Sequence, residues 1–127
     1  MKISYHIFNL LQEHDCVIVP NFGAFVARNI SAKISRDGSR IYPPNKEITF
    51  NKSLIKSDGL LINEISSIEN ISYEMANDKL NNWVVKSHKK IIKQGYIELK
   101  NIGSISLEND KYIFTPSQNS IFLKSSY

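Results

Sequence analysis

The feature that most constrains the fold is an internal repeat. Residues 19–25 read VPNFGAF and residues 99–105 read LKNIGSI, so both follow the pattern apolar-x-Asn-apolar-Gly-small-apolar. Each copy comes after a segment with the apolar spacing of a helix and before a segment typical of a hairpin. A single Asn-x-Gly match can arise by chance. A match of the motif, the preceding helix and the following hairpin, in the same order, rarely does. We therefore predict two unequal copies of one helix-plus-β-hairpin unit, residues 1–57 and residues 58–127.

The first unit is predicted to hold one helix, a sheet and a long hairpin. Apolar residues at helical spacing predict the helix over roughly residues 3–14. Strands are expected over residues 16–19, 24–27 and 46–50. The turn of the hairpin is expected at residues 36–39, because the glycine of an Asp-Gly pair accepts the positive φ that tight turns need.

The second unit is predicted to hold two helices and a shorter hairpin. Asp58 and Ser72 are candidate N-caps, and Gly95 stands where a left-handed C-terminal residue is expected after a helix over about 73–94. The strands are expected over residues 96–99, 104–107, 112–114 and 121–123. We also pair residues 42–44 with residues 114–116, as an aromatic-x-Pro stretch that follows the hairpin in each unit.

Three residues are predicted to be critical for the fold. Gly23 and Gly103 are flanked by residues typical of strands, where a glycine marks a bulge or a close approach of another element. We expect them to let each sheet bend over the preceding helix. Trp83 lies in the apolar stripe of the longest predicted helix, and we interpret it as a core residue rather than a stacking platform for bases.

Composition restricts the class of protein. The chain has 127 residues, a single cysteine (Cys16) and no apolar run of the length that a membrane span requires. A reducing, cytoplasmic location is the simple interpretation, without contact between this chain and a membrane. Residues 1–57 hold eight Lys and Arg against four Asp and Glu, whereas residues 58–127 hold eight of each. This uneven charge favours an anionic partner, and plain solubility explains it equally well.

The order helix, helix, strand, apolar-Gly-small-apolar, hairpin, strand resembles the HU/IHF histone-like superfamily. Residues 98–105 (ELKNIGSI) resemble the family's stretch around IGFGxF, residues 21–25 (NFGAF) resemble GFGxF, and residues 50–54 (FNKSL) resemble the segment after the family's arm. The resemblance implies an α+β fold in which two HU-like units pack as an intramolecular pseudo-dimer. The chain departs from the family in three respects: the first unit has one preceding helix, the second has no arm, and neither hairpin has the arm-tip proline.

The whole arrangement resembles the double-HU proteins of bacteria that often carry a membrane span and a SPOR domain further along. The segments that suggest it are residues 16–26, 42–44 and 50–52. This resemblance implies the cytoplasmic N-terminal region of a membrane-anchored protein linked to cell division. It also implies a module that binds or tethers DNA without reading its sequence.

The basic hairpin of the first unit is the best candidate site. Between residues 28 and 56 there are seven basic and two acidic side chains. The residues expected to bind nucleic acid are Arg28, Lys33, Arg36, Arg40, Lys46 and Lys52. In HU-type proteins an arm contacts phosphates and an apolar wedge kinks the duplex; Ile30, Ile34 and Ile41 are the candidate wedges. Three interpretations stay open: an arm for duplex DNA, a surface for an acidic protein partner, and a solvated hairpin whose charges prevent aggregation.

The remaining polar residues favour no enzyme. Lys86, Lys89, Lys90 and Lys93 suit the negative end of a helix dipole, with phosphate contact as the alternative. His6, His14 and His88 lack the spacing of a metal site, and Cys16 is interpreted as structural. No phosphate-binding loop, nucleophile elbow or paired catalytic carboxylates occur. We predict no metal, no cofactor and no small-molecule substrate, and the oligomeric state is left open.

Overall fold

The computed structural model describes residues 2–30, 33–34, 36–39, 41–42 and 45–117. In chain order, the elements of this part are α1 (Ile3–Leu11), β1 (Cys16–Val19), β2 (Gly23–Ile30), β3 (Lys33–Ile34), β4 (Ile41–Tyr42), β5 (Asn45–Asn51), α2 (Leu60–Glu69), α3 (Tyr73–Gln94), β6 (Tyr96–Leu99), β7 (Gly103–Glu108) and β8 (Lys111–Pro116). Arg40, Pro43, Pro44 and the strand predicted over residues 121–123 lie outside the described residues.

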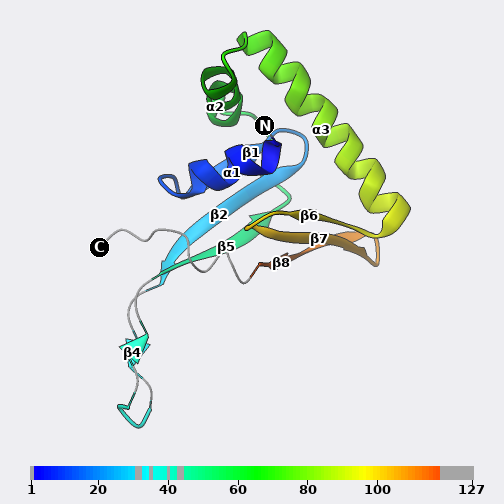
Figure 1. Ribbon diagram of the computed structural model, residues 1–127. Coiled ribbons are helices and arrows are strands. Elements are labelled where there is room, and N and C mark those ends of the chain that lie inside the picture. Colours follow the sequence, from blue (N-terminus) through cyan, green and yellow to red (C-terminus); the bar gives the residue numbers. More distant parts are fainter. Residues whose placement is uncertain (1, 31–32, 35, 40, 43–44, 118–127) are drawn as a thin grey trace.

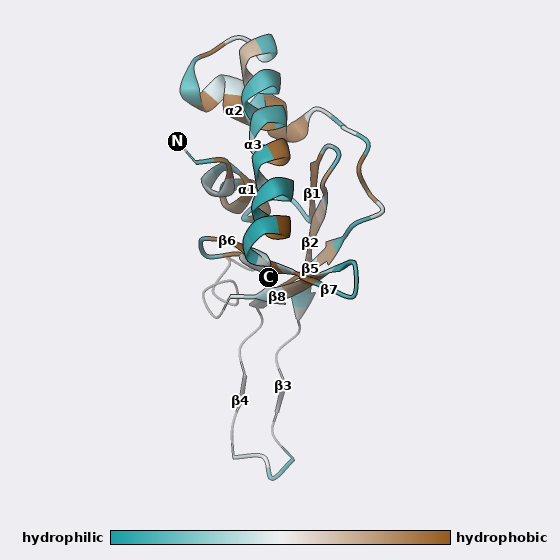
Figure 2. Ribbon diagram, turned by 90° about the vertical axis from the view of Figure 1, so that its right-hand side faces the viewer, coloured by the Kyte–Doolittle hydropathy of each residue, from teal (hydrophilic) through white to brown (hydrophobic). Residues whose placement is uncertain are grey.

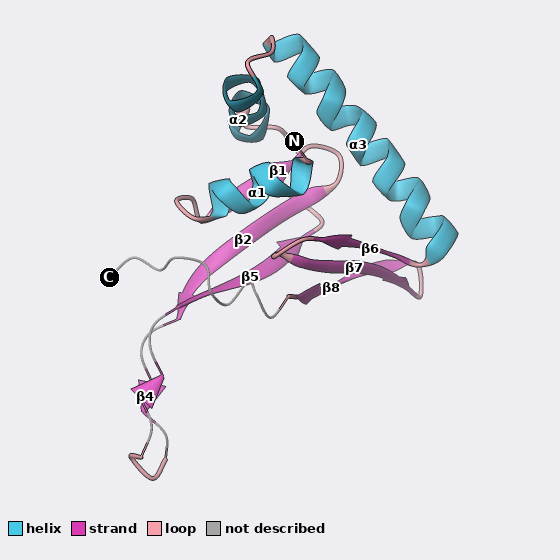
Figure 3. Cartoon of the chain, in the orientation of Figure 1, coloured by secondary structure: helices cyan, strands magenta, loops and turns pink. Residues whose placement is uncertain are grey.

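The protein is α+β, with two units that each contain helix and a three-stranded antiparallel sheet, as predicted. The first sheet has the order β1-β2-β5 and the second has the order β6-β7-β8. Figures 1 and 3 show the helices gathered on one side of the sheets, whereas the β3–β4 hairpin extends away from the helices. In Figure 2 the tip of that hairpin is hydrophilic, and the outward side of α3 is mostly hydrophilic as well.

The repeated motif adopts the same turn in both units. Asn21 has φ 63° and Asn101 has φ 66°, and the two glycines that follow have φ 153° and 154°. In each turn the apolar residue donates its backbone N–H to the carbonyl three positions earlier, from Phe22 to Val19 and from Ile102 to Leu99, at 3.0 Å in both. Asparagine tolerates this left-handed conformation better than most residues, which accounts for its place in the motif. The internal repeat is therefore confirmed at the level of backbone geometry.

The repeated glycines make room for a neighbouring strand rather than for a helix. A Cβ on Gly23 would lie 2.3 Å from the ring of Phe50 in β5, and a Cβ on Gly103 would lie 2.3 Å from the Thr115 carbonyl oxygen in β8. Another element thus approaches each glycine closely, as the sequence predicted, and the expected bend of each sheet over the preceding helices stays a prediction. At Gly103 the obstacle is a backbone atom of the neighbouring strand, whereas at Gly23 it is the end of a side chain.

The strand register also corrects the alignment of the two hairpins. Phe50 lies opposite Phe25, and Phe114 lies opposite Ile105 at the equivalent place in the second sheet. The counterpart of Phe114 is therefore Phe50. Tyr42 instead pairs with Lys33 far out on the long hairpin. The predicted match between residues 42–44 and 114–116 was wrong because the first hairpin is longer than the second.

The helix boundaries largely follow the capping signals. The Ser72 hydroxyl accepts from the backbone N–H of Met75 at 3.1 Å, and Gly95 ends α3 with φ 94°, as predicted. The N-cap of α2 is Gly59 rather than the predicted Asp58, although the Asp58 carboxylate accepts from the backbone N–H of Leu60 at 3.1 Å. The first helix is shorter than predicted: α1 ends at Leu11.

One hydrophobic core spans both units. The helix α2 lies against α1 and β1 of the first unit as well as against α3. At the junction of the two sheets, the ring of Phe114 in β8 contacts the rings of Phe25 and Phe50, with centroid distances of 5.8 and 6.3 Å. Leu80 and Ile91 of α3 are fully buried, as predicted. Neither unit is therefore a separate domain with a core of its own.

A polar cluster joins the three helices. The buried ring of His6 in α1 donates through Nε2 to Oε2 of Glu69 in α2 at 2.6 Å, because a carboxylate only accepts. Lys79 in α3 donates to the other carboxylate oxygen of Glu69. The hydrogen bond from Lys79, supported by that from His6, holds the pKa of the Glu69 carboxyl below its usual value, against the opposing effect of burial.

This lowered pKa predicts a stability that falls in acid. A carboxyl whose pKa is lower in the folded state stabilises the protein above its unfolded pKa, and the contribution disappears as the pH falls through the folded pKa. Glu69→Gln is therefore expected to lower the urea midpoint at neutral pH, with a difference from wild type that shrinks in acid. Glu108→Gln, at an exposed carboxyl, is the control and is expected to leave the midpoint unchanged. A Glu69→Gln difference that is equal at pH 7 and in strong acid would contradict this origin.

Candidate nucleic-acid interface

The basic hairpin begins in the first sheet as the β2–β5 pair, and the separate β3–β4 pair belongs to the same hairpin further along the chain. β2 pairs with β5 from Ala24 opposite Asn51 to Ile30 opposite Asn45, and β3 pairs with β4 in the same register. The shared register places the β3–β4 pair beyond the outer end of the β2–β5 pair, where Figure 1 shows it extending away from the helices. This is the arm that the sequence predicts, and we call it the β2–β5 arm.

The tip of the arm is a polar turn. Residues 36–39 are exposed, and Gly38 has φ 73°, which suits the Asp-Gly turn. The Asp37 carboxylate accepts from the backbone N–H of Ser39 at 3.0 Å and from its hydroxyl at 2.7 Å, so the acidic side chain is engaged within the turn. Arg36 thus presents its charge at the tip. The candidate wedge residues Ile34 and Ile41 lie opposite each other in the ladder, short of the tip.

At the base of the arm, Arg28 lies opposite an acidic partner. Its Nη2 donates to Oε2 of Glu47 at 2.6 Å across the strand pair, and the Arg28 side chain is 71% exposed. An exposed cross-strand pair of this kind contributes little to stability. It does offset part of the Arg28 charge, so any phosphate at this position competes with Glu47 for the guanidinium.

Lys46 does not belong to an exposed interface. Its side chain is 4% exposed, and its Nζ donates to the carbonyl oxygens of Leu11 and Gln12, each at 3.3 Å. These are carbonyls at the C-terminal end of α1, where a cation is favoured by the helix dipole. Lys46 therefore fixes α1 onto β5, and we remove it from the predicted interface.

Lys52 lies at the opposite end of β5 from the arm. Asn51, the last residue of β5, pairs with Ala24 at the sheet end of the ribbon, so Lys52 is remote from the tip. Its Nζ lies 4.5 Å from the centroid of the Tyr112 ring, a cation–π contact between the two units. The structure thus brings Arg28 and Arg36 onto one arm, together with the backbone of Lys33, and separates Lys52 from them.

A histidine joins the two units close to Lys52. His88 of α3 donates through Nε2 to the backbone carbonyl of Asn21 at 3.1 Å, because that oxygen only accepts. Its Nδ1 lies 2.6 Å from the Tyr112 hydroxyl, which donates to it when the ring is neutral. Burial raises the pKa of Tyr112. His88 therefore connects the repeated turn of the first unit to the hairpin of the second, a role that its sequence position did not reveal.

The second unit carries a tight hairpin instead of an arm. Glu108 lies opposite Lys111, and the two residues between them, Asn109 and Asp110, have φ 51° and 63°. Two successive positive φ values define the two-residue turn that suits the twist of a hairpin. In the described part of the chain, the arm is therefore confined to the first unit.

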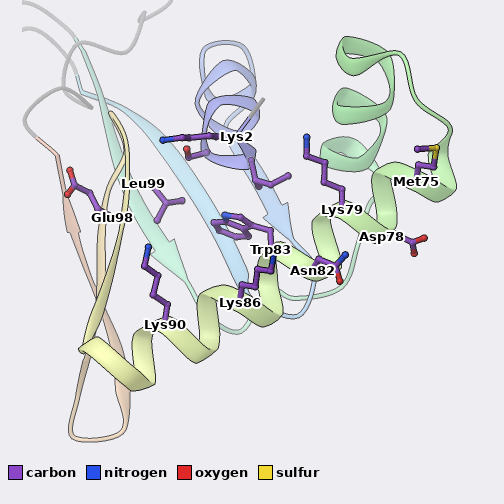
Figure 4. A pocket seen from close by; sticks show the side chains of 12 residues that line it. Lys2, Met75, Asp78, Lys79, Asn82, Trp83, Lys86, Lys90, Glu98 and Leu99 are labelled. Carbon is purple, nitrogen blue, oxygen red and sulfur yellow. The ribbon is translucent and has the colours of Figure 1, made fainter.

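Trp83 is partly buried, not enclosed as predicted. Its ring packs edge-to-face on Phe22 with centroids 5.4 Å apart, so it does contact the first unit. Its outer side lines a groove of about 740 Å³ between the start of α1, the face of α3 and β6. Figure 4 shows the indole on the floor of this groove with lysines on both sides.

The described residues bear on two kinds of site, a metal site and a reactive thiol. No group of three or more His, Cys, Asp or Glu side chains in that part of the chain is placed to hold a metal ion. Burial and the nearby Asp58 carboxylate raise the pKa of the Cys16 thiol, which disfavours the nucleophilic thiolate. No described helix combines the length and apolar character needed to cross a membrane.

Two helix-and-sheet units, one repeated Asn-x-Gly turn and a basic ribbon define an HU-like module. The chain belongs to the CCDC81-like prokaryotic HU family: the model of HU domain 1 matches residues 1–58, and the model of HU domain 2 matches residues 59–127. Neither match indicates a catalytic family. No curated protein and no solved structure matches the chain.

Proposed function

We propose that this chain is a DNA-binding module that binds duplex DNA through the β2–β5 arm without recognising its base sequence. The observation that carries the proposal is the arm itself, in which the β2–β5 and β3–β4 pairs share one register and Arg28 and Arg36 are exposed. Guanidinium groups on such a ribbon match the geometry of phosphate oxygens. Lys33 and Arg40, which flank the tip in sequence, belong to the proposed interface as well.

The binding is expected to depend steeply on salt. Each phosphate neutralised by a Lys or Arg releases counterions, with a log–log slope of about −0.9 per contact. Replacing Arg28, Lys33, Arg36 and Arg40 together with Gln is expected to weaken binding to every duplex about equally and to flatten the slope by up to roughly 3–4. Fluorescence anisotropy of labelled duplexes at several salt concentrations measures both quantities.

Two controls test where the contact lies. Replacing Lys86, Lys89, Lys90 and Lys93 with Gln removes the same number of charges from α3 and is expected to change the slope less. Glu47→Gln removes the carboxylate that pairs with Arg28 and is expected to strengthen binding. A wild-type chain that does not bind duplex DNA at about 50 mM salt, conditions that favour phosphate contacts, would show that the ribbon is not a DNA arm.

A protein-interaction scaffold is the second candidate function. The tight turn of the second unit favours it, because that unit presents no arm among its described residues. In this case the exposed arginines of the β2–β5 arm bind an acidic protein partner. The anisotropy experiment separates the two functions, since a scaffold leaves the duplex free at low salt.

We further propose that the module is cytoplasmic and forms the N-terminal region of a membrane-anchored protein linked to cell division. The support for this is the resemblance to double-HU proteins that carry a membrane span and a SPOR domain. The tandem order of the two family matches agrees with that arrangement. Such a protein would tether DNA to the envelope.

A further inference from the structure

The groove beside Trp83 is lined by an aromatic ring and lysines, and none of its described lining residues belongs to the β2–β5 arm. It lies between α1 and α3, on the helical side of the molecule, whereas the β2–β5 arm leaves the other end of its sheet (Figure 1). Its walls come from three segments that are far apart in the sequence. It therefore forms a surface separate from the proposed DNA interface.

One wall of the groove is an open sheet edge. β6 pairs with β7 on one side, and no described strand pairs with its other side. The backbone N–H of Leu107 donates to the carbonyl of Gly95, so alternate residues from Gly95 onward face β7. The backbone groups of Tyr96 and Glu98 therefore point outward, which agrees with the bond that the Tyr96 carbonyl accepts from the Gln94 side chain. An open edge of this kind accepts an added strand.

The charges around the groove indicate which kind of peptide strand could bind there. Lys2, the N-cap of α1, and Lys86 and Lys90 of α3 line the groove, and Figure 4 shows them around Trp83. Two acidic residues also line it, but in the same view the carboxylates of Asp78 and Glu98 point away from Trp83. The groove thus offers ammonium groups above an aromatic floor.

We propose that this groove binds an extended, acidic peptide segment of a protein partner by strand addition to β6. The backbone of the segment pairs with the outward groups of Glu98. Its acidic side chains meet Lys2, Lys86 and Lys90, and an apolar side chain packs on the exposed face of Trp83. The module then holds two partners at once, with DNA on the arm and a polypeptide on the helical side.

Trp83 provides the measurement, because it is the chain's one tryptophan. A short peptide in which glutamate alternates with valine is expected to change the Trp83 fluorescence of the full chain. The same peptide with lysine in place of glutamate is expected to have no effect. A glutamate peptide that is N-methylated at alternate residues keeps the charge but cannot pair with β6, and it is expected to lose binding. The backbone amide signal of Glu98 in an NMR titration is expected to shift with the first peptide alone.

Variants of α3 supply a matched control. The double substitution Lys86→Glu and Lys90→Glu reverses two charges in the groove and is expected to weaken binding at least about tenfold. Lys89→Glu with Lys93→Glu makes the same change, with the same spacing on the same helix, at residues that do not line the groove. That control is expected to weaken binding far less. If both double variants lose peptide affinity equally, the effect comes from the overall charge of the protein and not from the groove. That result would overturn the proposal.

Other occupants would give distinct results. A duplex that alters Trp83 fluorescence and displaces the peptide would assign the groove to nucleic acid. Fluorescence that changes with protein concentration before any peptide is added would assign it to a second copy of the chain. Either result overturns the proposal, and so does a glutamate–valine peptide that leaves Trp83 and the Glu98 amide unchanged.

Discussion

Phe22→Ala is expected to lower the free energy of unfolding by about 3–5 kcal/mol, as removal of a fully enclosed aromatic ring does in a well-packed core. Phe22 is 1% exposed, and its ring contacts Phe50 of its own unit. It also contacts Trp83, His88 and Tyr112 of the second unit. Urea unfolding followed by circular dichroism measures the loss. Because one core spans both units, the variant is expected to unfold in a single transition at lower urea.

Trp83→Ala is the comparison for Phe22. The indole is the larger side chain, but it is partly exposed in the groove, so its removal leaves an open depression rather than a closed cavity. The cost of such a substitution depends on how much of the removed surface was buried. We therefore expect a smaller loss of stability for Trp83→Ala than for Phe22→Ala. The reverse order would mean that the groove is closed in solution.

Gly103→Ala is expected to destabilise the protein by more than about 2 kcal/mol, because overpacking is added to an unfavourable φ. The new methyl group would lie 2.3 Å from the carbonyl oxygen of Thr115, a backbone atom held in β8. A backbone atom cannot yield without breaking the strand pairing. Thermal or urea unfolding measures the effect.

The equivalent substitution in the first unit is the matched control. At Gly23 the nearest atoms belong to the end of the Phe50 ring, a side chain that can rotate, and φ is almost the same. We expect Gly23→Ala to cost less than Gly103→Ala, with a change in the environment of Phe50. Gly38→Ala meets no atom within 4 Å and is expected to cost about 1 kcal/mol from φ alone. Equal losses of stability in Gly23→Ala and Gly103→Ala would show that the clash with the Thr115 carbonyl is not the cause of the larger cost expected at Gly103.

The sequence predicted the elements that depend on local signals. The Asn-x-Gly motif, the Ser72 cap, the Gly95 C-cap and the Asp-Gly turn all rely on φ values and bonds within a few residues, and the structure contains each of them. The tandem HU resemblance was likewise inferred from short motifs and their order, and the two family matches agree with it.

The errors concern long-range packing. Lys46 looked like one more exposed cation of the basic hairpin, but the end of α1, 34 positions earlier at Gln12, folds over it. The match of residues 42–44 with residues 114–116 failed because an arm of extra length separates equivalent residues. Lys2 and the edge of β6, which no described strand covers, were missed because no local sequence pattern predicts a groove assembled from distant segments.

The common core of the two units also determines how the module responds to dilution. When two such units are separate molecules, their pairing is bimolecular, and it fails when the concentration falls below the dissociation constant. Here one polypeptide joins them, so the pairing is unimolecular and each unit experiences a fixed effective concentration of the other. The pair therefore persists even where a cell holds very few copies of the chain.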